Sequence, residues 1–172
     1  MPTDDRDHRS GLRIHLLRHA HAGDPLKWDG PDAMRPLSRK GRRQASALGA
    51  FLAASDIRPE RILSSPKVRA HETADIVGAA LGVAPVLDDR LADDCDLHAL
   101  EDIVVRTGTR EVMLVGHDPY LSELFGELLG ARGVAMPKGA IATFDVRPPL
   151  RAGSGDLRWF VPPTIVPTSG TD

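Results

Sequence analysis

Short apolar segments alternate with longer amphipathic segments along most of this chain. Short apolar runs bounded by turn residues are typical of buried strands. Six segments have this character, and they span residues 13–17, 61–64, 85–87, 111–115, 140–146 and 157–161. The loop over residues 22–37 between the first strand and the first helix is rich in Pro and Gly, and loops of this length are often functional.

Helical periodicity fills the gaps between the strands. Ser38 is a suitable N-cap for a helix that reaches about Ser55. Ser65 is expected to cap a second helix, with Pro66 at its first position, that runs to Gly82. A third helix covers about residues 96–106, and a fourth begins at Asp118 and Pro119 and closes near Gly130.

Alternating strand and helix patterns predict an α/β fold, a three-layer α/β/α sandwich with a mostly parallel central sheet. The 172 residues suit one domain, which we expect over residues 11–162. Residues 1–10 are expected to be a disordered lead-in, and residues 163–172 a loose tail. In such folds, ligands bind outside the carboxyl ends of the strands.

The amino-acid composition argues against several classes of protein. The net charge of −2, from 22 basic and 24 acidic residues, argues against a general nucleic-acid binder. Cys95 is the only cysteine, which excludes an intramolecular disulfide and a cysteine zinc cluster. No apolar run is long enough for a transmembrane helix, and the polar start lacks a signal-peptide core. We therefore expect a cytoplasmic protein with no membrane partner.

Basic residues follow three of the predicted strands. The first strand ends in Arg18-His19, within LRIHLLRHA. The segment RILSSPKVRAHETA runs from a strand into a helix that carries Arg69, and VMLVGHDPYLSEL runs from a strand through His117 into the next helix. These side chains can reach a dianionic phosphate, and a histidine can attack it.

Four motifs in this order resemble the histidine phosphatase superfamily, the group that includes cofactor-dependent phosphoglycerate mutase. They are LLRHAHA, RPLSRKGRRQA, SSPKVRAHETA and VGHDP, and the resemblance covers roughly residues 12–146. Within the superfamily, the small SixA-type phosphohistidine phosphatases are the most similar in pattern. The resemblance implies a hydrolase that works without a metal or other cofactor.

The resemblance further implies that His19 is a nucleophile that forms a phosphohistidine intermediate. Only a neutral imidazole nitrogen can attack phosphorus, so the other ring nitrogen must be held as a donor, as a backbone carbonyl can do. Arg18, Arg69 and His117 would bind the equatorial oxygens of the transferred group. The expected substrate is a phosphohistidine-bearing protein or a small phosphorylated compound.

Other side chains are candidates for substrate contact. His21 follows the nucleophile closely, and Lys138 precedes the strand over residues 140–146. Arg35 could reach substrate or could pair with Asp32. By contrast, His15 is expected to be a strand residue with its own partner.

Three aspartates are candidates for the general acid that protonates the leaving group. They lie in LADDCDL, where some family members keep their acid, and are Asp93, Asp94 and Asp96. Because the match to a family pattern is poor, the acid could also come from elsewhere. A phosphohistidine leaving group needs little such help.

Several alternatives remain open at this stage. The chain could be a phosphomonoesterase for a small metabolite, whereas the short segment after residues 85–87 does not resemble the long insertions of the mutases. It could also be a catalytically silent phosphate-binding module. In a different class, His15, His19 and His21 share strand parity and could bind zinc together.

Overall fold

The computed structural model describes residues 11–168, and their strands form one six-stranded sheet. The predicted strands are all present, with ends that differ by one residue at most. They are β1 (Leu12–Arg18), β2 (Arg61–Ser64), β3 (Pro85–Leu87), β4 (Glu111–Gly116), β5 (Ile141–Val146) and β6 (Asp156–Val161).

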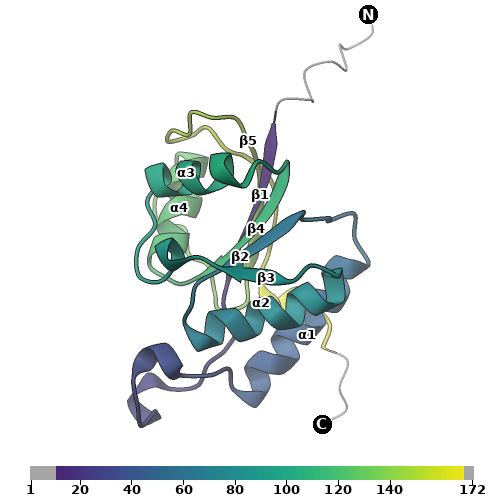
Figure 1. Ribbon diagram of the computed structural model, residues 1–172, viewed down its shortest axis with the longest axis vertical. Coiled ribbons are helices and arrows are strands. Elements are labelled where there is room, and N and C mark those ends of the chain that lie inside the picture. The colour runs from purple at the N-terminus through teal and green to yellow at the C-terminus, as the bar shows by residue number, and fades with distance from the viewer. Residues whose placement is uncertain (1–10, 169–172) are drawn as a thin grey trace, which may run out of the picture.

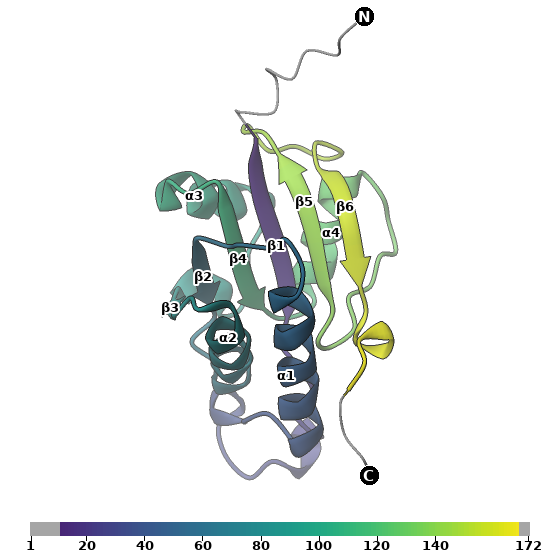
Figure 2. The same ribbon diagram turned by 90° about the vertical axis from the view of Figure 1, so that its right-hand side faces the viewer.

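The strand order is β3-β2-β4-β1-β5-β6. The first four strands in this order are parallel to one another, and β5 runs antiparallel to both β1 and β6. The carboxyl ends of β1, β2 and β4 therefore meet at one edge of the sheet, at the lower end in Figure 2. This arrangement confirms the predicted mostly parallel sheet.

Helices cover both faces of the sheet (Figures 1 and 2). In Figure 2, α1 (Arg39–Ala53) and α2 (Val68–Leu81) lie in front of the sheet. On the opposite face lie α3 (Leu97–Thr107) and α4 (Tyr120–Leu129). The predicted three-layer sandwich is thus confirmed.

The alternation of side chains along β1 explains why both faces need a helical layer. Ile14 and Leu16 belong to the core cluster that contains the apolar faces of α3 and α4. Leu17 points the other way and packs with Leu48 of α1 and Val77 of α2. Because successive strand residues face opposite sides, a central strand with buried apolar side chains pointing both ways must be covered on both faces.

The helix starts show one success and one failure of the sequence prediction. Ser38 is the N-cap of α1, and its hydroxyl oxygen accepts a hydrogen bond from the Gly41 N–H at 3.1 Å. The predicted cap at Ser65 is wrong, because α2 begins three residues later and its N-cap is Lys67. The Ser65 hydroxyl instead contacts His117, a side chain that follows another strand.

The chain ends fall partly outside the described residues. The predictions for residues 1–10 and 169–172 concern segments that the structure does not describe. Residues 163–168 differ from the expected loose tail, because Pro163–Ile165 form a short 3₁₀ turn. Val166 is buried in the core cluster under α1 and α2. Among residues 11–168, no helix is long and apolar enough to span a membrane.

Gly41 is required by the close approach of α1 to the segment that follows β1. A Cβ at this position would lie 1.9 Å from the carbonyl oxygen of His21. That carbonyl cannot easily move, because it accepts hydrogen bonds from both the N–H and the hydroxyl of Ser38.

We therefore expect Gly41→Ala to lower the free energy of unfolding by about 2 kcal/mol or more, since overpacking outweighs the roughly 1 kcal/mol that alanine normally adds in a helix. The measurement is urea unfolding followed by circular dichroism. Ser46→Ala, at an exposed position of the same helix, is the control and should change stability by less than about 0.5 kcal/mol. Equal stability of Gly41→Ala and the wild type would contradict the steric argument.

Candidate active site

Strand register brings the sequence-predicted residues together at the lower edge of the sheet. Arg18 pairs with Gly116 across β1 and β4, and the His19 N–H donates to the Gly116 carbonyl at 3.0 Å. On the other side of β4, the Ser65 N–H donates to the Val115 carbonyl at 3.0 Å. His19, Ser65 and His117 are thus the first residues after three adjacent parallel strands.

His19 is held as a neutral imidazole with one nitrogen exposed to the site. Its Nδ1 lies 2.7 Å from the Ala20 carbonyl oxygen, which can only accept, so Nδ1 carries the proton. Burial lowers the pKa of His19 to about 2, and the charges of Arg69 and Arg18 act in the same direction. The Nε2 atom therefore keeps its lone pair at all physiological pH values, which is the state a nucleophile needs.

His117 faces His19, with 5.0 Å between the ring centroids. Its Nε2 lies 2.8 Å from the Ser65 hydroxyl, whose oxygen also accepts from the Lys67 N–H. The Ser65 proton is therefore free to go to Nε2, and we assign the His117 proton to Nδ1. Burial, with the charges of Arg69 and Lys67, lowers the pKa of His117 to about 3, so this ring is neutral as well.

The Arg18 guanidinium group is anchored through its Nη1 atom. Its Nη1 donates to the Met136 carbonyl at 2.6 Å and lies 2.7 Å from the Asp118 carboxylate. Asp118 follows β4 directly after His117, so the same strand end supplies both a ring and a counter-charge.

Arg69, in the first turn of α2, is anchored in the same way. Its Nη1 donates to the Asp32 carbonyl at 2.7 Å, and its Nη2 donates to the Asp32 carboxylate at 2.9 Å. The Thr73 hydroxyl accepts from the Ala20 N–H and donates to the Arg69 carbonyl, which ties α2 to the residue after His19.

Three nitrogen atoms at this site are buried without a partner. Within residues 11–168, the buried side-chain polar atoms that lack a hydrogen bond are Arg18 Nε, Arg69 Nε and His117 Nδ1. Buried polar groups are nearly always paired, because leaving one unpaired costs about 1–3 kcal/mol. The charges of Arg69 and Arg18 both act on His117, so the three unpaired donors belong to one region, which suits an anionic ligand.

The three predicted substrate-contacting residues have different surroundings. Arg35 donates from Nε to Asp32 at 2.9 Å and from Nη1 to the Ala22 carbonyl at 2.7 Å, so the structure favours the pairing alternative. The Nδ1 of His21 lies 2.7 Å from the Ser38 hydroxyl. The pKa of Lys138 is lowered by burial and by the charges of Arg18, Arg35 and Arg69, so Lys138 borders the same cationic region.

The three candidate acids are separated by the structure. Asp96 is the N-cap of α3, where its carboxylate accepts from the Ala99 N–H at 2.8 Å. Asp94 is exposed. Asp93 forms an ion pair with Lys67, at 2.7 Å between Oδ1 and Nζ, and Lys67 is close enough to lower the pKa of His117. Asp93 is therefore the aspartate connected to the site.

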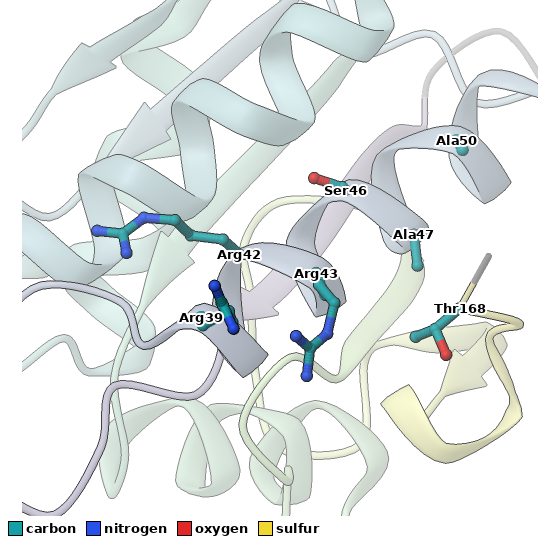
Figure 3. A pocket seen from close by; sticks show the side chains of 7 residues that line it. All are labelled: Arg39, Arg42, Arg43, Ser46, Ala47, Ala50 and Thr168. Carbon is teal, nitrogen blue, oxygen red and sulfur yellow. The ribbon is translucent and has the colours of Figure 1, made fainter. Parts of the chain in front are cut away.

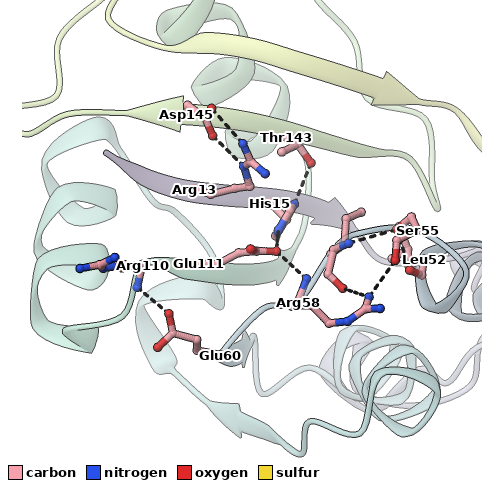
Figure 4. Close-up of polar contacts among 11 residues, drawn as sticks. Arg13, His15, Leu52, Ser55, Arg58, Glu60, Arg110, Glu111, Thr143 and Asp145 are labelled. Atoms are coloured by element: carbon pink, nitrogen blue, oxygen red, sulfur yellow. Dashed lines mark hydrogen bonds and ion pairs between the residues drawn. The ribbon is translucent and has the colours of Figure 1, made fainter. Parts of the chain in front are cut away.

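His15 lies in the middle of β1, in a separate network (Figure 4). Its ring nitrogens lie 2.7 Å from the Thr143 hydroxyl and 3.0 Å from the Glu111 carboxylate. The expectation that His15 has its own partner is confirmed. His15, His19 and His21 contact different groups, so they form no common site. Among the described residues, no three His, Cys, Asp or Glu side chains are grouped to hold a metal ion.

Two surface hollows lie elsewhere on the molecule. One, of about 520 Å³, runs along α1 and is lined by Arg39, Arg42 and Arg43 together with small side chains (Figure 3). The other, of about 680 Å³, lies at the amino-terminal edge of β1 and β4 and contains the Arg13–Asp145 ion pair. Neither is lined by the residues with unpaired nitrogens.

The chain is similar in sequence to known proteins of one family. Residues 14–95 match the model of the histidine phosphatase superfamily (branch 1). The phosphohistidine phosphatase SixA of Escherichia coli (strain K12) is 26% identical over 158 residues, which cover 88% of this chain and 94% of that protein. An uncharacterized protein of Picosynechococcus sp. is 33% identical over 116 residues, or 65% of this chain and 70% of that protein.

The fold is similar as well. The solved structure of the protein histidine phosphatase SixA complexed with tungstate superposes with a TM-score of 0.76, at 24% identity over 89% of this chain and 98% of that one. That structural similarity concerns the fold. On the family match over residues 14–95 and the two relatives in sequence, the chain belongs to the histidine phosphatase superfamily, branch 1.

Sequence reasoning missed the residues that hold the site in shape. Tyr120 accepts a hydrogen bond from the His117 N–H at 3.1 Å and donates to the Leu91 carbonyl at 2.7 Å. Ser65 and Asp32 contact His117 and Arg69 as described above. The sequence analysis named Asp32 only as a possible partner of Arg35 and Ser65 only as a helix cap, and no local signal pointed to Tyr120.

The low pKa of His19 predicts a specific pH dependence of stability. Below pH ~6.5 the unfolded chain takes up a proton on this ring, whereas the folded chain does not until about pH 2. Folding stability due to this ring is therefore complete above pH ~6.5 and declines as the pH falls. We expect the stability difference between wild type and His19→Asn to change by up to about 2 kcal/mol in favour of the variant between pH 6.5 and 5.

The measurement is urea unfolding of both proteins in buffers without phosphate. Parallel pH curves for wild type and variant would show that the folded ring titrates normally.

Proposed function

We propose that this chain is a phosphatase that transfers a phosphoryl group to His19 and then to water, without a metal ion. The observation that carries the proposal is the set of three unpaired buried nitrogens beside a neutral His19. A phosphoryl group has three non-bridging oxygens, and it can accept hydrogen bonds from Arg18 Nε, Arg69 Nε and His117 Nδ1 together.

The reaction proceeds in two displacements. In the first, the lone pair of His19 Nε2 forms a bond to phosphorus while the bond to the leaving group breaks, and the leaving group keeps that electron pair and takes up a proton. In the second, the oxygen of a water molecule attacks phosphorus, the N–P bond breaks and water loses a proton, so inorganic phosphate leaves and the neutral imidazole returns. Arg18, Arg69 and His117 stabilise the charge on the equatorial oxygens in both steps.

The substrate is, in our proposal, a phosphohistidine-bearing protein or a small phosphorylated compound. The relatives named SixA support the first of these. About nine residues separate β3 from α3, so this connection forms no long cover over the site, which suits a protein-borne phosphoryl group. A phosphomonoesterase acting on a small metabolite is the second candidate, and a screen of phosphorylated metabolites and phosphohistidine proteins discriminates between them.

We expect His19→Ala to remove phosphatase activity, with a fall of at least about 10³-fold, because no other group can accept the phosphoryl group. The assay is turnover of para-nitrophenyl phosphate in EDTA, in which the wild type stays active and is inhibited by vanadate. Acid-labile, base-stable phosphate should be found on His19 after rapid quenching. His71→Ala, which changes a partly exposed histidine paired with Asp75, is the control and should keep full activity.

Two results would contradict the proposal. Turnover by His19→Ala at the wild-type rate would overturn the mechanism. Vanadate binding by a wild type that shows no turnover of any phosphorylated compound would favour the silent phosphate-binding module.

We further propose Asp93 as the proton donor for basic leaving groups. General acid help is worth ~10²–10⁴-fold when the leaving group is basic and much less when it is not. Asp93→Asn should therefore lose about 10²-fold in kcat/KM on an alkyl phosphate and less than about threefold on para-nitrophenyl phosphate. Asp89→Asn, an exposed change in the same loop, is the control. Equal losses on both substrates would exclude a role in proton transfer.

A further inference from the structure

Asp32 connects two buried arginines through a single carboxylate. Its Oδ1 accepts from Arg35 Nε at 2.9 Å, and its Oδ2 accepts from Arg69 Nη2 at 2.9 Å. Its backbone carbonyl accepts from Arg69 Nη1 at 2.7 Å. Both arginines are less than a tenth exposed, whereas the Asp32 side chain is 55% exposed.

The contacts with Asp32 leave only one edge of Arg69 for a ligand. A guanidinium group is planar, so fixing Nη1 and Nη2 also fixes the direction of the Nε–H bond. That Nε is one of the three buried atoms without a partner. Asp32 thus sets the direction of the Arg69 Nε–H bond, although Asp32 accepts no hydrogen bond from that Nε.

The segment that carries Asp32 depends on these same contacts. Asp32–Met34 form a 3₁₀ turn in the loop between β1 and α1. Arg35 fixes the other side of the carboxylate and also donates to the Ala22 carbonyl, near the start of that loop. Arg35, Asp32 and Arg69 therefore form a chain of charge-assisted hydrogen bonds from the loop to the site.

Asp32 also opposes the positive charge of the site. Burial raises its pKa, but the hydrogen bond from Arg35 and the charge of Arg69 together hold the pKa below its usual value, so the carboxylate is ionised at neutral pH. Its negative charge weakens the attraction of the site for any anion, including the product.

We propose that Asp32 is a positioning residue for phosphoryl transfer, which holds Arg69 so that its Nε–H meets the transferred group in the transition state. The inference rests on the proposed phosphatase function. It implies that Asp32 improves kcat through orientation while its charge slightly opposes binding of the ground state. These two effects have opposite signs, and a residue that only supports the fold would not produce them.

The test is Asp32→Asn in the full chain, with Asp29→Asn as the matched control at an exposed position of the same loop. Asn keeps the backbone carbonyl and much of the side-chain shape but cannot accept from both arginines with one ionised group. We expect kcat on para-nitrophenyl phosphate to fall about tenfold to a hundredfold, since a misaligned charged donor is lost mainly in the transition state.

Inhibition by vanadate and by inorganic phosphate distinguishes the effect of Asp32 on the orientation of Arg69 from the effect of its negative charge. Vanadate adopts the geometry of the transition state, so its inhibition constant should rise in parallel with the loss of kcat. Inorganic phosphate resembles the ground state, so its inhibition constant should stay the same or fall. If both inhibition constants rise together, or neither changes, the positioning role is wrong.

A double-mutant cycle tests whether Asp32 acts through Arg69. In an Arg69→Ala background, Asp32→Asn should change kcat by less than about twofold, because the group that it orients is absent. Equal effects of Asp32→Asn in both backgrounds would overturn the inference.

The wild type and His19→Ala test the phosphatase function independently of Asp32. If wild type hydrolyses para-nitrophenyl phosphate and His19→Ala does not, the function holds whatever Asp32→Asn does. Thermal melting of Asp32→Asn within a few degrees of wild type shows that the variant is folded, and a second variant, Asp32→Ala, should show the same separation of vanadate from phosphate.

Discussion

The structure depends on holding cationic and polar hydrogen-bond donors close together where they are buried from solvent. Arg69, His19 and His117 are all at most 6% exposed. Bringing unpaired charges together costs free energy both through desolvation and through mutual repulsion. The molecule limits this cost by keeping the two imidazoles neutral and by setting carboxylates against the outer edges of the two arginines, Asp118 for Arg18 and Asp32 for Arg69.

The remainder of the fold serves to hold these groups in place. The parallel pairing of β1 and β4 sets the relative height of His19 and His117, and a shift of one residue would turn alternate side chains to the wrong face. The helices then act from two sides, because α2 supplies Arg69 and Thr73, and α4 supplies Tyr120. The donor residues thus lie on rigid elements or directly after them, as preorganised electrostatic stabilisation requires.

The elements and the strand ends could be predicted because their signals are local. An apolar run followed by Arg18-His19 is visible without knowledge of the fold, and so is the cap at Ser38. The partners of these residues could not be predicted, because they depend on which loops meet at the edge of the sheet. Asp32 lies in a loop rich in Pro and Gly whose path has no periodic signal. Ser65 was expected to cap α2, but its hydroxyl contacts a histidine 52 positions away.

Gly116, at the end of β4, limits how this sequence can change over evolution. A Cβ there would lie 1.8 Å from the hydroxyl oxygen of Tyr120, the group that accepts from the His117 N–H and donates to Leu91. Any larger residue at position 116 must displace that hydroxyl, and the His117 N–H then loses its acceptor. Positions 116 and 120 should therefore vary together among relatives, with glycine present wherever this tyrosine occurs.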